Sequence, residues 1–186
     1  TTHIDFYGVG PAPTPALVVV DTPGYGYSRR GKTAAAEWME KLRLYLSSRS
    51  PATLARTFVL LDGRHGLTST DAAVLDALDD AMCPYTLVLT KIDEAGVAEL
   101  EARAWSLAVA VSRRAMLQPV LHAVSAHSGE GLPTLLASMV HAARLHTRVV
   151  DREGGGGGAA TPGAGASAPL SWETLLAESG LQAGAP

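Results

Sequence analysis

Residues 85–93 read YTLVLTKID, an apolar run of a strand's length followed at once by a polar turn. A run this rich in Val and Leu is typical of a strand buried on both faces, as in a parallel sheet covered by helices. Similar short runs occupy residues 16–20, 58–61 and 120–124. Residues 85–89 therefore predict a buried strand, and the three similar runs predict further strands of the same kind.

Helical patterns separate these runs. Apolar residues recur at helical spacing within residues 38–46, 74–82, 100–111 and 132–143, and the second of these stripes ends at Met82. Four alternations of strand and helix predict an α/β fold with a doubly wound, mostly parallel sheet. Residues 1–9 predict an earlier strand, which the Pro-rich residues 10–15 join to the next one as an antiparallel hairpin.

The composition fits one globular domain with an appendage. The chain has 186 residues, 47% apolar and 18% charged, with a net charge of −3. A single cysteine excludes a disulfide framework, and no apolar run reaches the roughly 20 residues of a membrane-spanning helix. We expect a domain at residues 1–150, a Gly/Ala/Pro-rich linker at 151–169, and a short helix with a tail at 170–186.

A polar turn follows the run at residues 16–20. In an open α/β sheet, ligands bind at the carboxyl ends of the strands. The turn reads Asp21-Thr22-Pro23-Gly24. A carboxylate there can hold Mg²⁺ directly or through water, and a glycine lets a backbone N–H approach a phosphate oxygen closely. The same tetrapeptide also fits an Asp-initiated Pro-Gly turn that binds nothing.

The turn Thr90-Lys91-Ile92-Asp93 has the chemistry to recognise guanine. The Asp93 carboxylate can accept from the ring N–H and the exocyclic amine of guanine, a pair of donors that adenine lacks. The methylenes of Lys91 can lie over the base plane while the ammonium stays hydrated. Ser125 and Ala126, after the run at 120–124, are small enough for a backbone N–H to reach a purine carbonyl. Each turn by itself also fits a solvated strand end.

The order of the three turns resembles the third, fourth and fifth motifs of the P-loop GTPases, DxxG, [NT]KxD and SA. Within these proteins the chain resembles the EngB family, in which Thr90 in place of the commoner Asn is typical. Residues 21–27, DTPGYGY, are similar to its DLPGYGYA, and residues 62–71 to its D-x-R-H-G-x-T-x-x-D. Residues 4–7 are similar to its I-N-F-F strand, and the resemblance covers about residues 1–150.

This resemblance implies a guanine-nucleotide switch that hydrolyses GTP, uses Mg²⁺ and acts in assembly of the large ribosomal subunit on its rRNA. It implies a GTP-binding site made of Asp21, Thr22, Pro23, Gly24, Tyr25, Thr90, Lys91, Asp93, Ser125 and Ala126. Asp21 would meet Mg²⁺ through water, and the Gly24 N–H would contact the γ-phosphate. Tyr25 stands where many GTPases carry a water-positioning Gln, so we expect slow intrinsic turnover and assign no catalytic residue.

The phosphate loop departs from the family pattern. Residues 26–33, GYSRRGKT, fit G-x-x-x-x-G-K-[ST], but no buried strand precedes them and they follow the DTPG turn. We expect the true phosphate-binding segment to lie upstream of Thr1 and its strand to lie between those at 16–20 and 58–61. Two alternatives are a nucleotide-free scaffold protein that keeps the fold and a GTPase of another branch, acting on tRNA or membranes.

Charge and tail composition bear on partners and location. Residues 29–56 hold seven basic residues against two acidic ones, so this basic stretch is the expected contact with rRNA. The glycine tract and the alanine-rich tail favour an organelle with a bacterial-type ribosome, and hence the mitochondrion, with the bacterial cytoplasm as the alternative. We expect no membrane association and a monomer away from the ribosome. The histidine spacings predict no zinc site.

Overall fold

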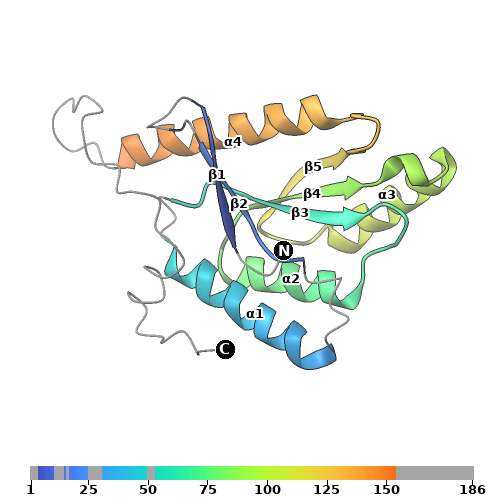
Figure 1. Ribbon diagram of the computed structural model, residues 1–186, viewed down its shortest axis with the longest axis horizontal. Coiled ribbons are helices and arrows are strands. Elements are labelled where there is room, and N and C mark those ends of the chain that lie inside the picture. The colour runs from blue at the N-terminus through green and yellow to red at the C-terminus, as the bar shows by residue number, and fades with distance from the viewer. Residues whose placement is uncertain (1–3, 11–14, 16, 25–30, 50–52, 154–186) are drawn as a thin grey trace. The chain divides into compact units, whose positions relative to one another are not determined.

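The computed structural model describes residues 4–10, 15, 17–24, 31–49 and 53–153. The chain divides into two compact units, and Figure 1 labels their elements. The first unit comprises residues 1–38 with 153–186, and the second comprises residues 39–152. Helix α1 (Gly31–Ser48) begins in the first unit and ends in the second. Its predicted apolar stripe is confirmed at Tyr45 and Leu46, which are buried.

The first unit contains a hairpin. Strand β1 (Asp5–Val9) pairs antiparallel with β2 (Leu17–Asp21), in a register that places Asp5 opposite Asp21 and Val9 opposite Leu17. The Pro-rich connection is short, and antiparallel neighbours need only a short connection. The predicted hairpin is therefore confirmed.

The second unit contains a parallel sheet of three strands in the order β3-β4-β5. The strands are β3 (Thr57–Asp62), β4 (Tyr85–Thr90) and β5 (Leu117–Ala123). The connections run through α2 (Ser69–Asp80), then η1 (Ile92–Glu94) and α3 (Val97–Val111), and α4 (Leu132–Glu153) follows β5. In Figure 1, α4 lies along one side of this sheet and α2 along the other. The expected α/β fold with a parallel sheet is confirmed.

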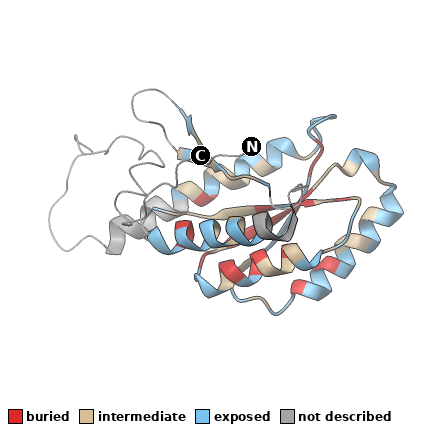
Figure 2. Ribbon diagram, turned by 60° about the horizontal axis from the view of Figure 1, so that its bottom comes forward, coloured by how far each residue is buried: buried red, intermediate tan, exposed pale blue. Residues whose placement is uncertain are grey.

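The core of the second unit is built around β4. Residues 85–89 are all buried, with Tyr85 and Val88 completely so. Against them lie the apolar stripes of α2 and α3, whose inner sides Figure 2 shows as buried, among them Leu75, Leu78 and Leu107. The prediction of a strand buried on both faces is confirmed for β4.

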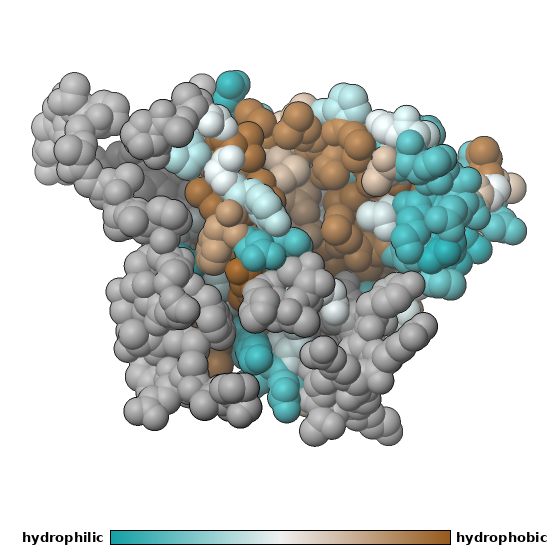
Figure 3. All heavy atoms as spheres, in the orientation of Figure 1, coloured by the Kyte–Doolittle hydropathy of each residue, from teal (hydrophilic) through white to brown (hydrophobic). Residues whose placement is uncertain are grey.

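The two outer strands differ from that prediction. Leu60 of β3 is 60% exposed, and Val120 of β5 is 49% exposed. The register aligns Leu60 with Val88 and Val88 with His122, so Leu60 lies on the same face of the sheet as His122. Figure 3 shows apolar side chains gathered in front of α4 and the sheet. Among the described residues, β3 pairs with no second strand, so its outer edge is open.

Helix α2 has well-defined ends. Its N-cap, Thr68, accepts the Asp71 N–H through its hydroxyl, and its own N–H donates to the Asp71 carboxylate, which forms a capping box. At the other end Cys83 N–H donates to Leu78 O and Met82 N–H to Asp79 O. This is a Schellman motif, and Met82 has the left-handed φ of 52° that usually selects glycine there. The prediction that Met82 extends the buried stripe was wrong, since it lies beyond the helix and is 70% exposed.

Met82→Gly is expected to stabilise the protein by about 0.5–1 kcal/mol. The substitution removes the steric cost of a left-handed side chain, and the added freedom of the unfolded chain offsets part of the gain. Little burial is lost because Met82 is exposed. Urea denaturation followed by circular dichroism measures the change. Met82→Ala keeps the Cβ and the strained φ, so an equal gain from alanine would contradict this explanation.

Candidate functional site

The carboxyl ends of the three parallel strands lie at one edge of the second unit. The turns that follow β3, β4 and β5 comprise residues 62–64, 90–94 and 124–126, and we call them together the strand-end site. Val124 N–H donates to Leu89 O at 2.8 Å, so the third turn is bonded to the end of β4. The structure therefore brings five predicted site residues of this unit to one edge of the sheet: Thr90, Lys91, Asp93, Ser125 and Ala126.

The central turn is held to both neighbouring strands. The Thr90 hydroxyl donates to Leu61 O at 3.1 Å, and Ile92 N–H donates to Val124 O at 3.4 Å. Between them Lys91 has φ 57° and ψ 39°, a left-handed conformation that a non-glycine residue adopts at a cost. The single turn η1 follows and contains Asp93. The Thr90 hydroxyl thus ties the end of β4 to the end of β3.

Asp93 and Ser125 interact across two turns. The Asp93 side chain is exposed, and a hydrogen bond from the Ser125 side chain is the main cause that lowers the pKa of its carboxyl. Ser125 is fully buried, and its Oγ also accepts the N–H groups of His127 and Ser128 at 3.1 and 3.0 Å. The Ser125 hydroxyl thus orders the Ser-Ala turn, and its proximity favours the ionised form of the Asp93 carboxyl.

The turn after β5 closes through glycine. Ser125 N–H donates to Glu130 O at 3.0 Å, and the chain then enters α4 through Gly131, whose φ is 72°. A Cβ on Gly131 would lie 2.0 Å from Ala123 O, so no other residue fits without moving the end of β5. Ala126 is exposed at this turn, with its backbone accessible from solvent.

A charged network joins Lys91 to three residues that were not among the predicted site residues: Asp62, Arg64 and Glu94. Asp62, the last residue of β3, accepts from Arg64 Nε at 2.9 Å, from a second Arg64 nitrogen at 2.6 Å, and from Lys91 Nζ at 2.9 Å. Arg64 also donates to Glu94 Oε2 at 2.7 Å. The Arg64 hydrogen bond, followed by that from Lys91, holds the pKa of Asp62 well below its usual range. A signal was present in the sequence, since Asp62 ends an apolar run just as Asp21 does.

Acid is expected to weaken this network through Asp62. Its folded pKa lies below that of the unfolded chain, so the ionised carboxylate stabilises the fold above roughly pH 4. This contribution is lost as the pH falls from there toward the folded pKa. Asp62→Asn should therefore flatten the dependence of the free energy of unfolding on pH below about pH 4. Asp76→Asn, which removes the exposed partner of Arg114, is the control, and an equal flattening in both variants would contradict the prediction.

The DTPG turn belongs to the first unit. Asp21 is the last residue of β2, and its carboxylate is exposed and makes no hydrogen bond or ion pair with another described residue. Gly24 is also exposed, with open space where a Cβ would stand. A single free carboxylate at a strand end fits Mg²⁺ held partly by water, since this ion usually keeps several waters. Thr22 and Pro23 lie between Asp21 and Gly24, and Tyr25 lies outside the described residues.

Two further kinds of site were sought in the described ranges. No group of three or more His, Cys, Asp or Glu side chains there is arranged to hold a metal ion. None of the helices in those ranges combines the length and the apolarity needed to cross a bilayer. Cys83 is buried beside the end of α2, and burial raises the pKa of its thiol.

Comparison with curated proteins gives close relatives. The chain is 40% identical over 128 residues to the probable GTP-binding protein EngB of Rhodopseudomonas palustris strain TIE-1, covering 69% of this chain. It is 35% identical over 146 residues to the corresponding protein of Hyphomonas neptunium, covering 78% of this chain. The chain belongs to the EngB family. It spans 58% and 64% of the length of these two EngB proteins.

Solved structures agree on the fold of this EngB chain. The elongation factor SelB of Methanococcus maripaludis in complex with the GTP analogue GppNHp superposes with a TM-score of 0.56 over 77% of this chain, at 20% identity. Its apo form gives 0.53 over 67% of this chain. The matches cover 28% and 24% of the SelB chains. The expected P-loop GTPase type of α/β fold is therefore confirmed. No protein-family model matches the chain.

Proposed function

We propose that this chain supplies the guanine-recognising part of a GTPase. The observation that supports this best is the hydrogen bond from Ile92 N–H to Val124 O, which holds the loop of Lys91 and Asp93 beside the small-residue turn at the carboxyl end of β5. Asp93 would accept from the ring N–H and the exocyclic amine of guanine. Lys91 would cover the base plane with its methylenes, and the turn at Ser125 and Ala126 would offer a backbone N–H to the purine carbonyl.

We also propose a magnesium and phosphate role for the DTPG turn of the first unit. Asp21 would hold Mg²⁺ through water, and Gly24 would present its N–H to the terminal phosphate without a side chain in the way. The ion would neutralise charge on the phosphates when bound. Tyr25 offers a phenol where an amide would position the attacking water, so hydrolysis by this protein alone should be slow, and a partner would accelerate it.

Retention of radiolabelled nucleotide by the full-length protein tests this proposal. GTP and GDP should bind, unlabelled GTP should displace the label, and ATP in equal excess should not. Removal of Mg²⁺ by a chelator should weaken GTP binding because Asp21 then lacks its ion. A folded full-length protein that retains neither nucleotide would favour the alternative of a scaffold that keeps the fold without a ligand.

We further propose a role in assembly of the large ribosomal subunit, through the basic stretch at residues 29–56. Within it Lys41 and Arg43 are exposed on α1, whereas Arg29 and Arg30 lie outside the described residues. A surface with a formal net charge of +5 suits contact with rRNA phosphates, which makes binding fall steeply with salt. We propose the mitochondrion as its location and a monomer when off the ribosome. Microscopy and sedimentation would check these two points.

Charge reversal in the basic stretch should separate ribosome binding from nucleotide binding. Changing Arg29, Arg30 and Lys32 to Glu, with or without Lys41→Glu, is expected to reduce co-sedimentation with large-subunit particles at moderate salt. The affinity for GDP should not change. A loss of GDP affinity with intact co-sedimentation would instead assign residues 26–33 to the phosphate site. Recovery of tRNA or lipid in place of rRNA with the purified protein would favour another GTPase branch.

A further inference from the structure

We propose that the turn Asp62-Gly63-Arg64 is a positioning device for guanine recognition, which holds the Lys91 ammonium with Asp62 and the Asp93 loop with Arg64. The inference rests on the proposed function and extends it to three residues of the strand-end site that have no proposed contact with the nucleotide. The family-like motif at residues 62–71 thereby gains a chemical role. These are positioning residues, because they act on the nucleotide only through the loop at residues 91–94.

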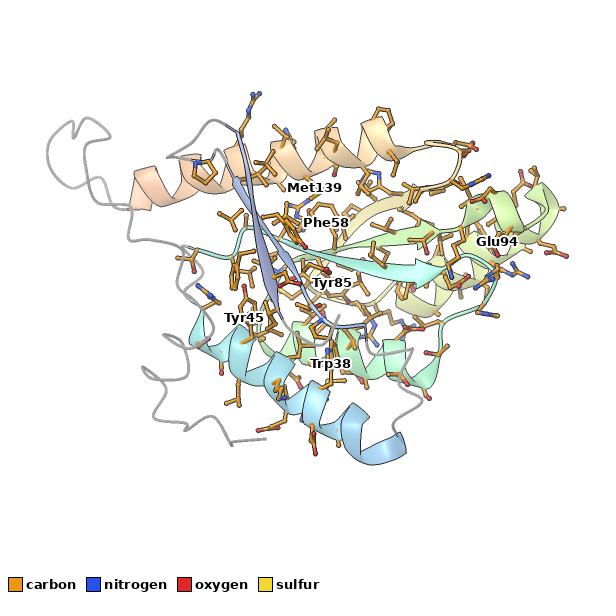
Figure 4. All side chains as sticks on the ribbon, in the orientation of Figure 1. Trp38, Tyr45, Phe58, Tyr85, Glu94 and Met139 are labelled. Atoms are coloured by element: carbon orange, nitrogen blue, oxygen red, sulfur yellow. The ribbon has the colours of Figure 1, made fainter. Side chains whose placement is uncertain are left out.

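The contacts form a chain from β3 to η1. The Arg64 guanidinium donates to both oxygens of the Asp62 carboxylate, and the Arg64 backbone N–H donates to Asp62 Oδ1 at 3.0 Å. Such a forked pair fixes direction as well as distance. Lys91 Nζ also donates to Asp62 Oδ2, and Arg64 Nη1 donates to Glu94 Oε2. Figure 4 labels Glu94 near the carboxyl ends of β3 and β4.

Gly63 ties this turn to the sheet. Its N–H donates to Thr90 O at 2.8 Å, and its own carbonyl accepts from Arg103 of α3 at 2.7 Å. A Cβ at this position would lie 2.6 Å from Thr90 O, which is backbone that cannot move aside cheaply. The carboxylate of Asp62 is therefore carried on a support that is itself fixed to the residue preceding Lys91.

The loop is consequently restrained from two sides. Asp62, at the end of β3, holds the Lys91 ammonium, while Val124, after β5, accepts the Ile92 N–H. The two residues proposed to contact guanine lie two positions apart on one loop between these anchors. Lys91 needs such restraint, because its left-handed backbone is disfavoured and its long side chain has many rotamers. The partial exposure of these ion pairs makes their contribution to global stability small, which leaves local placement as their main effect.

A double-mutant cycle tests the inference in the full-length protein. Asp62→Asn is expected to weaken GDP binding by about two- to tenfold, the lower part of the range of coupling between groups in contact. In a Lys91→Met background the same change should have no further effect, because Asp62 acts through Lys91. Arg114→Met is the matched control, since it removes a comparable pair of ion contacts to Asp76 and Asp79 elsewhere on the domain. Its GDP affinity should match that of the parent.

Hydrogen exchange gives a readout independent of nucleotide. The Glu94 amide, bonded to Lys91 O, should exchange faster in Asp62→Asn and remain unchanged in Arg114→Met. Unchanged exchange of this amide in Asp62→Asn would overturn the inference. The inference would also fail if Asp62→Asn reduced GDP affinity as much in the Lys91→Met background as in the parent. If the parent protein binds no GDP, the proposed function fails. The exchange of this amide alone then supports or overturns the positioning of the loop by Asp62 and Arg64.

Discussion

Asp93→Asn is expected to weaken binding of GDP and GTP by roughly 5- to 150-fold, the loss typical of one mismatched bidentate base contact. The same change should raise the affinity for xanthosine diphosphate, because the amide offers a donor where xanthine presents a second carbonyl. The structure makes the substitution conservative, since Asp93 is exposed and no core packing depends on it. Isothermal titration of the full-length protein with the three nucleotides measures both changes.

Glu99→Gln is the control for this experiment. Glu99 is an exposed carboxylate in the first turn of α3 that pairs with Arg103, so its loss removes one negative charge near the site without altering the loop. GDP affinity should remain that of the parent. Equal affinities for GDP in Asp93→Asn and the parent would remove Asp93 from the base site, whatever the result with xanthosine diphosphate.

Leu60→Lys is expected to have opposite effects in two settings. In residues 1–186 alone, an exposed leucine on an open strand edge promotes association between chains, so lysine should raise the soluble yield. Because β3 has no second partner strand among the described residues, residues 1–186 by themselves should aggregate and bind no GTP. Supplying the part of the Rhodopseudomonas palustris relative that this chain does not match should restore folding and nucleotide binding. Leu60→Lys should then prevent that restoration, because the incoming segment would bury the ammonium.

Trp105→Lys separates general solubility from this specific effect. Trp105 lies on α3 and is 75% exposed, so its replacement should also raise the soluble yield. It should leave complementation intact, because Trp105 lies on a helix and not on β3. Size-exclusion chromatography and retention of labelled GTP measure the two outcomes. If the parent residues 1–186 melt cooperatively and bind GTP by themselves, the expectation is contradicted and a phosphate site at residues 26–33 is favoured.

The sequence predicted the central strand and its turn because both signals are local. Residues 85–89 are apolar without a break, and Thr90, Lys91 and Asp93 follow immediately. The predicted start of β5 was wrong, because the strand begins at Leu117, three residues before the predicted run at 120–124. The reason is that Pro119 interrupts the apolar pattern, whereas an edge strand tolerates proline.

The charged network could not be read from one turn at a time. Asp62 and Lys91 are 29 positions apart, and only the register of β3 against β4, which places Asp62 beside Thr90, makes them neighbours. The exposure of Leu60 and Val120 was equally hidden. Hydropathy reports that a side chain prefers burial, while its actual burial depends on which elements cover each face of the sheet.

Met82 and Lys91, the two non-glycine residues of the described ranges with a left-handed backbone, should respond differently to selection. At Met82 the conformation serves only the end of α2, so variants chosen for folding alone should drift toward glycine or asparagine there. At Lys91 the same drift would discard the side chain that Asp62 holds. A library screened for abundance should therefore lose both residues, whereas one screened for guanine-nucleotide binding should lose methionine at position 82 and keep lysine at position 91. A stabilising substitution at position 82 would thus offset the loss of stability caused by changes in the loop at residues 91–94.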